Sequence, residues 1–233
     1  MADNPGSVII QARFRGPTTS GNGGYTCGIV ASEIAGIAEV MLRRPPPLER
    51  PLTLAHRDGV VLLDGDETVA QGKPSTLDLS VPQPPSFAEA QDKARHYTGF
   101  EGHPFPECFV CGPARAVGDG LRIFAGRENG ERLVAAPWVP DTSMCDSHGR
   151  VDPKILWAAL DCPGYFAIET GETAVLGKMT AQTQGDVHAG ERCVVIGWSL
   201  GQEGRKLHTA TALFSAAGEL VGQSRQVWVK LAG

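Results

Sequence analysis

A single carboxylate interrupts an apolar run in the segment 154–164, KILWAALDCPG. Every residue from 155 to 162 is apolar except Asp161. Burying an ionised carboxylate is costly, so such a residue usually has a hydrogen-bonding partner, a shifted pKa or a chemical role. Three interpretations follow: Asp161 acts as a base or nucleophile, it accepts hydrogen bonds from nearby backbone, or it pairs with Arg192 or Lys178.

Two short motifs offer ligands for a metal ion. Cys108 and Cys111 form a C-x-x-C pair, and Cys145 and His148 form a C-x-x-H pair. Together they supply the Cys3His set of a tetrahedral zinc site, and His103 is an alternative fourth ligand. A redox-active pair is a second interpretation, although no thioredoxin-like βαβ pattern surrounds it. We favour a third, two thiols buried beside aromatic residues, and we expect no metal and no other cofactor.

Strand-like segments make up most of the chain that must position these residues. Residues 7–14, SVIIQARF, and 191–200, ERCVVIGWSL, are rich in β-branched residues. Residues 206–214 and 220–231, joined by SAAGE, predict a β-hairpin. In its second strand four residues share one face: Gly222, Ser224, Gln226 and Trp228.

Two helices are expected among these strands. The first covers residues 24–38, which are small and apolar apart from one Ser-Glu pair. The second has Asp152 as its N-cap and Pro153 in its first turn, and it ends or kinks near Pro163. Each helix follows a Gly-containing loop and precedes a series of strands. We interpret this as an α+β fold with a duplicated unit of one helix and one antiparallel sheet.

The two units have a connecting segment between them. We place the first unit at residues 1–81 and the second at 121–233, with a linker at 82–120 that contains the C-x-x-C pair. Proline and glycine mark the linker as a connection, and its phenylalanines indicate that it packs against the rest of the protein.

Composition excludes several classes of function. The 233 residues carry a net charge of −5 without a run of five like charges, so a nucleic-acid partner is not expected. No apolar run approaches the roughly 18 residues of a membrane span, and MADNPGSVII has no signal-peptide pattern. We therefore expect a soluble cytoplasmic protein that does not bind membranes, with six free cysteines rather than disulfides.

The duplicated unit resembles the double-hotdog proteins of the acyl-CoA thioesterase superfamily. In the phenylacetyl-CoA type, a His-Gly-Gly turn opens the central helix and an Asp follows about two turns later. Here Asn22-Gly23-Gly24 supplies that turn with Asn in place of His, and Asp161 falls at the acid position in the second half. The resemblance implies two fused hotdog units, each a long central helix wrapped by an antiparallel sheet, and a homodimer of the whole chain.

A second type, thioesterase II, combines an Asp on the second helix with a Thr on the next strand and a Gln on the last strand. Gln226 matches that Gln, whereas Thr180 lies near the Thr position without matching it cleanly. The resemblance implies hydrolysis of an acyl-CoA or related acyl thioester. Asp161 would be the base or nucleophile, and Gln226 would hold the water.

The turn at the start of the first helix has its own implied roles. The N–H groups of Gly23 and Gly24 would stabilise the oxyanion, helped by the helix dipole. Asn22 would orient the thioester or the water. Because the central helices of paired hotdog units lie side by side, Asn22 of one half is expected to face Asp161 of the other. The dipole at the end of the second helix should raise the pKa of Asp161.

Further residues are assigned to the substrate. His148 and Gly149 lie in the loop before the second helix, where they could act as the family's His-Gly pair. Thr180 is assigned to the same site, and Arg43 and Arg44 are candidate contacts for CoA.

Other functions stay open. A hotdog dehydratase or hydratase typically has an Asp-x4-His pair, which this sequence lacks. A protein that binds acyl-CoA or a lipid-like ligand without turnover is favoured by Asn22 and by the imperfect Thr match. A structural paralogue with an interface in place of a pocket is a third alternative. The acyl group and its carrier do not follow from the sequence.

Overall fold

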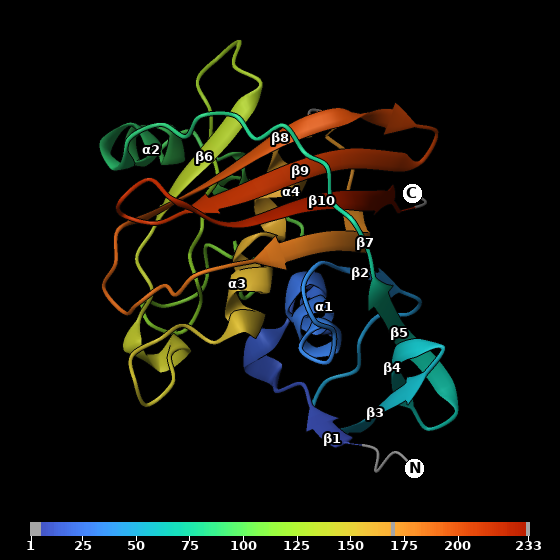
Figure 1. Ribbon diagram of the computed structural model, residues 1–233. Helices are drawn as coiled ribbons and strands as arrows, with labels where there is room; N and C mark the ends of the chain where they lie inside the picture. Colours follow the sequence, from blue (N-terminus) through green and yellow to red (C-terminus); the bar gives the residue numbers. More distant parts are fainter. Residues whose placement is uncertain (1–5, 169–170, 232–233) are drawn as a thin grey trace.

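The computed structural model describes residues 6–168 and 171–231. The strands of this part form one antiparallel sheet in the order β1-β3-β4-β5-β2-β7-β10-β9-β8-β6. Figure 1 shows the sheet curving around helix α1, with α3 beside α1. The predicted α+β class is confirmed.

Within the described residues, each half supplies five strands, and the central helix of the second half is divided into two. The first half contains α1 (Gly23–Ala31) with β1 (Gly6–Ile9), β2 (Ala38–Leu42), β3 (Pro51–Arg57), β4 (Gly59–Asp64) and β5 (Glu67–Pro74). The second half contains α3 (Pro153–Ala159) and α4 (Cys162–Phe166) with β6 (Leu133–Trp138), β7 (Ala174–Thr183), β8 (Cys193–Glu203), β9 (Lys206–Phe214) and β10 (Leu220–Lys230). Helix α2 (Phe87–Ala94) lies between the halves in sequence, and short 3-10 helices cover Ala12–Phe14, Thr98–Phe100 and Thr142–Met144.

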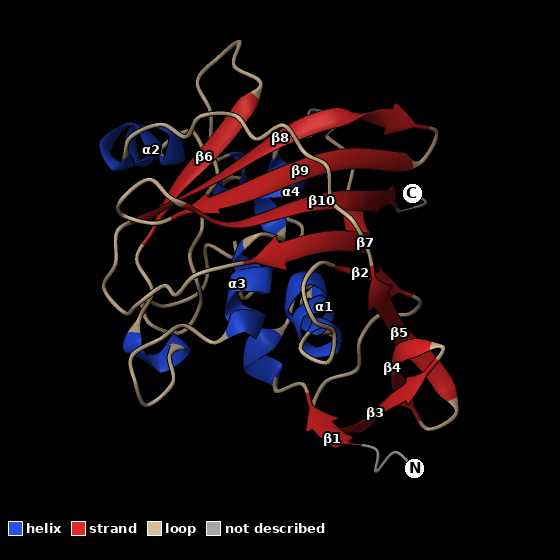
Figure 2. Cartoon of the chain, in the orientation of Figure 1, coloured by secondary structure: helices blue, strands red, loops and turns tan. Residues whose placement is uncertain are grey.

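Strands β2 and β7 join the two halves into one sheet. They pair antiparallel from Ala38 opposite Ala181 to Met41 opposite Lys178. The central helices are visible on the concave side of the sheet in Figure 2. The described residues thus contain the predicted duplicated unit, while the boundaries at residues 81 and 120 stay a prediction.

Helix α1 is shorter than predicted, because it ends at Ala31 instead of residue 38. The hydroxyl of the next residue, Ser32, donates to the Ile29 carbonyl over 2.8 Å and so competes with the helical hydrogen bonds. Ser32 and Glu33 are also exposed, whereas the helix itself is buried from Gly24 onward. The helical segment therefore stops where the chain leaves the core.

The predicted second helix is two helices with a break at residues 160–161. Its start is as expected, since Asp152 accepts a hydrogen bond from the Lys154 N–H over 2.9 Å and Pro153 occupies the first turn. Pro163 has no N–H for the Ala159 carbonyl, so α3 ends at Ala159. The predicted end or kink near Pro163 is thus a break just before it, and Pro163 itself lies in the first turn of α4.

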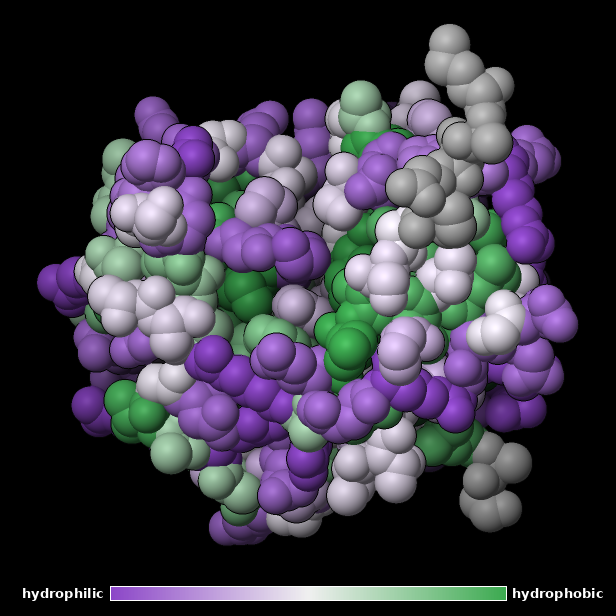
Figure 3. Space-filling view, turned by 90° about the horizontal axis from the view of Figure 1, so that it is seen from below, coloured by the Kyte–Doolittle hydropathy of each residue, from purple (hydrophilic) through white to green (hydrophobic). Residues whose placement is uncertain are grey.

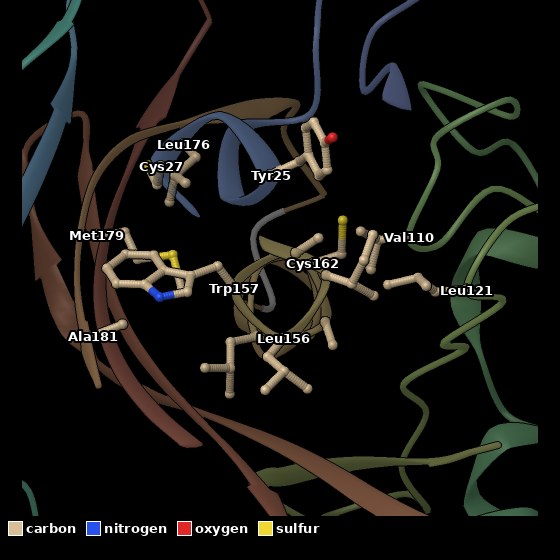
Figure 4. Packing of buried hydrophobic residues seen from close by; sticks show 14 of the residues in the cluster. Tyr25, Cys27, Val110, Leu121, Leu156, Trp157, Cys162, Leu176, Met179 and Ala181 are labelled. Atoms are coloured by element: carbon tan, nitrogen blue, oxygen red, sulfur yellow. The ribbon is translucent and has the colours of Figure 1, made fainter. Parts of the chain in front are cut away.

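Glycines allow the two central helices to approach closely. A Cβ on Gly24 would lie 2.6 Å from the Asp161 Cβ, and a Cβ on Gly28 would lie 2.9 Å from the Lys154 Cα. The sheet side of α3 is packed more conventionally, with Trp157 directed toward Met179 of β7 (Figure 4). The small residues of α1 thus fix the distance between the halves.

The linker packs on the protein, as predicted. Phe109 is fully buried, while Phe100 is half exposed. Helix α2 covers the far face of the sheet, where Phe87 and Ala90 pack with residues of β6, β8 and β9. No helix in the described part of the chain is long and apolar enough to cross a membrane. Figure 3 shows one face of the surface, with hydrophobic patches between polar residues.

Candidate functional site

A cavity of about 290 Å³ lies beside the N-terminus of α1. Its walls come from both halves of the chain and from the linker, and they are largely apolar. Aromatic and aliphatic side chains line it, among them Leu42, Phe105, Tyr165, Leu176 and Trp228. Of the predicted site residues, the cavity is lined by Asn22, Gly23, Arg43, Arg44 and Asp161.

Asp161 is a buried carboxylate on the wall of this cavity, with 2% of its surface exposed. Its Oδ2 accepts hydrogen bonds from the Asn22 side-chain amide over 2.8 Å and from the Gly24 N–H over 2.9 Å. Its Oδ1 has no hydrogen-bond partner among the described residues. The prediction that Asn22 faces Asp161 across the two halves is confirmed. One carboxylate oxygen is anchored, and the other is buried without a hydrogen-bond partner in the described structure.

Asn22 has a fixed orientation because it is also the N-cap of α1. Its Oδ1 accepts the Tyr25 N–H over 2.8 Å, and its carbonyl accepts the Thr26 N–H and hydroxyl. The amide nitrogen is then left to point at Asp161. The asparagine found here in place of histidine therefore both starts the helix and holds the carboxylate.

The pKa of Asp161 is raised to about 7, primarily because burial disfavours the charged form. The Gly24 N–H opposes this shift, Cys108 adds to it, and the Asn22 amide opposes it. The predicted cause of a raised pKa is the dipole of the second helix. Burial is the main cause instead.

This pKa predicts a pH dependence of stability. The folded protein keeps a proton on Asp161 that the unfolded chain loses near its ordinary pKa of 3.8, so stability should fall as pH rises from about 4 to about 7. Between about pH 5.5 and pH 8 the free energy of unfolding of the wild type should decrease by on the order of 2 kcal/mol more than that of Asp161→Asn. Urea denaturation of both proteins, with a chelator present to keep metal ions from the neighbouring thiols, measures the difference. Equal decreases in the free energy of unfolding of the two proteins would contradict the raised pKa of Asp161.

The salt-bridge alternatives for Asp161 do not occur. Arg192 stacks over the Phe87 ring at 4.2 Å, and Lys178 pairs with Glu39 at 3.0 Å.

Gln226 lies beneath the site, not in it. It is fully buried on the inner face of β10, on the side that the strand pattern gives it with Ser224 and Trp228, but it does not line the cavity. Its Nε2 donates to the Leu160 carbonyl and to the Ser224 hydroxyl, and its Oε1 accepts from the Trp228 indole over 2.8 Å and from the Thr209 hydroxyl over 3.2 Å. These hydrogen bonds use both the nitrogen and the oxygen of the Gln226 side-chain amide. Gln226 thus supports the helix break directly before Asp161, in place of the predicted contact with a catalytic water.

Three other predicted site residues lie elsewhere. Thr180 points to the outer face of the sheet, because it pairs with the exposed Arg225 and its hydroxyl lies 3.4 Å from the Glu39 carboxylate. His148 is exposed, and Gly149 occupies a left-handed position with φ of 74° in the same turn. None of the three lines the cavity, so the structure does not bring them to Asp161.

Gly24 also differs from its predicted role. Its N–H already donates to Asp161, so it is not available to an oxyanion. The Gly23 N–H has no acceptor in the described structure and lies on the cavity wall. This leaves Gly23 as the donor at the N-terminus of α1 that faces the cavity.

Three thiols gather on the same wall: Cys108, Cys111 and Cys162, all buried. Their sulfur atoms lie within 4.8 Å of one another. The predicted grouping of the C-x-x-C pair with Cys145 and His148 is wrong, because those two lie in the turn that precedes α3 and outside this cluster. Sequence reasoning missed Cys162, although it is adjacent to Asp161. Only the packing of α4 against the linker brings it to the pair.

The pKa values of the three thiols are shifted in different directions. Burial raises the pKa of Cys111 and of Cys162. Hydrogen bonds from these two thiols lower the pKa of Cys108, with help from the backbone N–H groups of Cys111 and Val110. Cys108 is therefore the thiol of the three that ionises most readily.

No family model and no curated protein sequence matches this chain. Solved structures do. A hotdog-fold protein of unknown function from Alicyclobacillus acidocaldarius is 10% identical, with 100% of this chain and 95% of that chain covered and a TM-score of 0.62. The tesB protein of Mycobacterium avium subspecies paratuberculosis is 14% identical, with 97% and 92% covered and a TM-score of 0.62. A putative thioesterase II from Thermobifida fusca is 14% identical, with 100% and 94% covered and the same TM-score of 0.62. The likeness extends over both halves, and the chain thus has a double-hotdog fold.

Proposed function

We propose that the protein hydrolyses an acyl thioester, of CoA or a related carrier, in the cavity beside α1. The observation that carries this proposal is Asp161, a buried carboxylate with one oxygen anchored by Asn22 and Gly24 and the other without a partner. Two of the structures that share the fold are named as a tesB protein and a putative thioesterase II, which supports the same reaction class.

Asp161 acts as a general base in this reaction. Its Oδ1 takes a proton from a water molecule, and the water oxygen attacks the carbonyl carbon of the thioester. The tetrahedral intermediate carries its negative charge on the former carbonyl oxygen, which accepts a hydrogen bond from the Gly23 N–H at the N-terminus of α1. The C–S bond then breaks, the proton passes from Asp161 to the leaving thiolate, and a carboxylic acid and a thiol are released.

The lining of the cavity suits the two ends of such a substrate. Apolar residues such as Leu42, Leu176 and Trp228 would surround the acyl group. Arg43 and Arg44 follow β2 at the cavity and would contact the phosphates of CoA. Arg44 pairs with Glu67, whereas the Arg43 guanidinium has no acidic partner in the described structure. Arg43 is therefore the stronger candidate for an anionic group.

A panel of acyl-CoA esters tests the proposal. Release of free thiol, followed together with the melting temperature, should reveal turnover of at least one ester in the panel. Stabilisation by acyl-CoA without thiol release would contradict hydrolysis and support a binding protein, which the asparagine at position 22 also favours. Neither turnover nor stabilisation with any ester would reject both functions.

A further inference from the structure

The three thiols on the cavity wall have the spacing of metal ligands. The Sγ atoms of Cys108 and Cys162 are 3.7 Å apart, and all three sulfurs lie within 4.8 Å of one another. Zinc binds thiolates at about 2.3 Å in tetrahedral geometry, which separates two sulfur ligands by about 3.8 Å. The cluster is therefore close to the arrangement that one zinc ion requires.

The loop that contains the C-x-x-C pair is held in a fixed shape. The Gly112 N–H donates to the Cys108 carbonyl over 2.9 Å, and a Cβ on Gly112 would lie 2.5 Å from the Cys108 backbone. Phe109 is bonded on both sides, since its N–H donates to the Arg15 carbonyl and its carbonyl accepts the Leu121 N–H, each over 2.8 Å. Cys108 and Cys111 are therefore positioned before any ligand arrives.

His103 completes the surroundings of the thiols as a hydrogen-bond donor. Its Nε2 lies 3.4 Å from the Cys111 Sγ, and its Nδ1 accepts the Phe105 N–H over 2.8 Å. Because Nδ1 is an acceptor, the ring proton belongs on Nε2 and points at the sulfur. A ring nitrogen that carries a proton cannot ligate a metal, so His103 orients and polarises Cys111 from outside the ligand set.

Ionisation of these thiols and binding of a cation depend on each other. Burial keeps Cys111 and Cys162 protonated in the absence of a metal, and three thiolates this close together are stable only if a positive ion lies between them. Thiolates are soft ligands, which favour zinc over magnesium or calcium. A disulfide would use only two of the three sulfurs, and its S–S bond of about 2.05 Å is far shorter than the observed separation.

We infer that Cys108, Cys111 and Cys162 bind one zinc ion, with the fourth coordination position open to the cavity. All three cysteines line the cavity together with Asp161. Sites with three protein ligands and one open position bind an exchangeable ligand, whereas structural zinc sites are closed by a fourth side chain. The ligand class for the open position is water or a thiol.

Metal content of the purified protein tests the site without any substrate. The protein is reduced, stripped with a chelator, and dialysed anaerobically against Zn²⁺ or Co²⁺. We expect one metal ion per chain for the wild type and thiolate-to-cobalt charge-transfer absorption in the near ultraviolet. Cys162→Ala should lose both. Cys27→Ala and Cys193→Ala, which remove buried thiols outside the cluster, should keep both.

Two further measurements do not depend on the folding of the Cys162 variant. X-ray absorption of the zinc-loaded wild type should find three sulfur neighbours at about 2.3 Å. His103→Gln should keep one metal ion per chain with about 10- to 100-fold weaker affinity, as expected for a group outside the ligand set. A fourth protein sulfur or nitrogen ligand would overturn the open position.

The inference is overturned if reconstituted wild type holds no metal while all six cysteines are free thiols, or if two of the three cluster cysteines form a disulfide under the same conditions. Equal metal loss in Cys27→Ala would overturn the assignment to these cysteines. Because no acyl thioester enters the assay, absence of hydrolysis would reject the proposed function and leave the metal site standing.

Discussion

Asp161→Asn should abolish thioester hydrolysis and leave the protein folded. A general base contributes about 10²- to 10⁴-fold to a rate, so kcat/KM is expected to fall by that factor. The Asn side chain has the same shape and retains an oxygen that can accept the Gly24 N–H. It also removes a carboxylate whose ionisation burial disfavours, so the melting temperature at about pH 8 should be unchanged or higher.

Asp66→Asn is the matched control. It makes the same change in the exposed turn between β4 and β5 and should alter neither turnover nor stability. Turnover by Asp161→Asn within about tenfold of the wild type would remove Asp161 from the mechanism. A large drop in melting temperature would instead give the carboxylate a structural role, because its hydrogen bonds join the two halves.

Gly24→Ala should destabilise the protein. The new methyl group would lie 2.6 Å from the Asp161 Cβ and 2.7 Å from the Trp157 carbonyl oxygen, and backbone atoms cannot move aside as a flexible side chain does. Overpacking of this kind costs about 1–3 kcal/mol, which lowers the melting temperature of a protein of this size by several degrees. Hydrolysis should fall as well, since separating α1 from α3 moves the N–H that holds Asp161.

Gly6→Ala provides the comparison for this substitution. Gly6 begins β1, and an added Cβ would meet nothing within 4 Å. Its melting temperature should match the wild type. If Gly24→Ala and Gly6→Ala melt alike, α1 and α3 do not approach each other as closely as described.

The sequence could predict the features that depend on local patterns. Alternation along 220–231 grouped Gln226 with Ser224 and Trp228 on one face, which is the buried one, and Asp152-Pro153 marked the start of α3. The meeting of Asn22 with Asp161 came from the resemblance, because the paired helices of that fold supply a contact that no local pattern contains. Predictions failed where the outcome depended on register or packing. The pairing of β7 with β2 and β10 turns Thr180 outward.

The thiol cluster was beyond sequence reasoning for a similar reason. Cys162 lies 51 residues after Cys111 in the sequence (162 − 111). The C-x-x-C pair lies between α2 and β6, in a segment without the periodicity that would predict where it packs. The predicted partners, Cys145 and His148, matched the spacing of zinc motifs but not the path of the chain. Sequence spacing alone could not show that Cys162, and not the C-x-x-H pair, lies next to the C-x-x-C pair in the folded protein.

Joining two related units in one chain has removed their equivalence. Asp161 follows Asp152, the N-cap of α3, by nine positions, and the residue nine positions after Asn22, the N-cap of α1, is Ala31. The glycine that follows Asn22 is matched by Pro153 after Asp152, and proline has no N–H to donate. A dimer of identical units would have to repeat each residue in both copies. Covalent fusion frees each half to change independently, so the arrangement of Asn22, Gly24 and Asp161 occurs once in the described residues, and the matching positions of the other unit are not bound to repeat it.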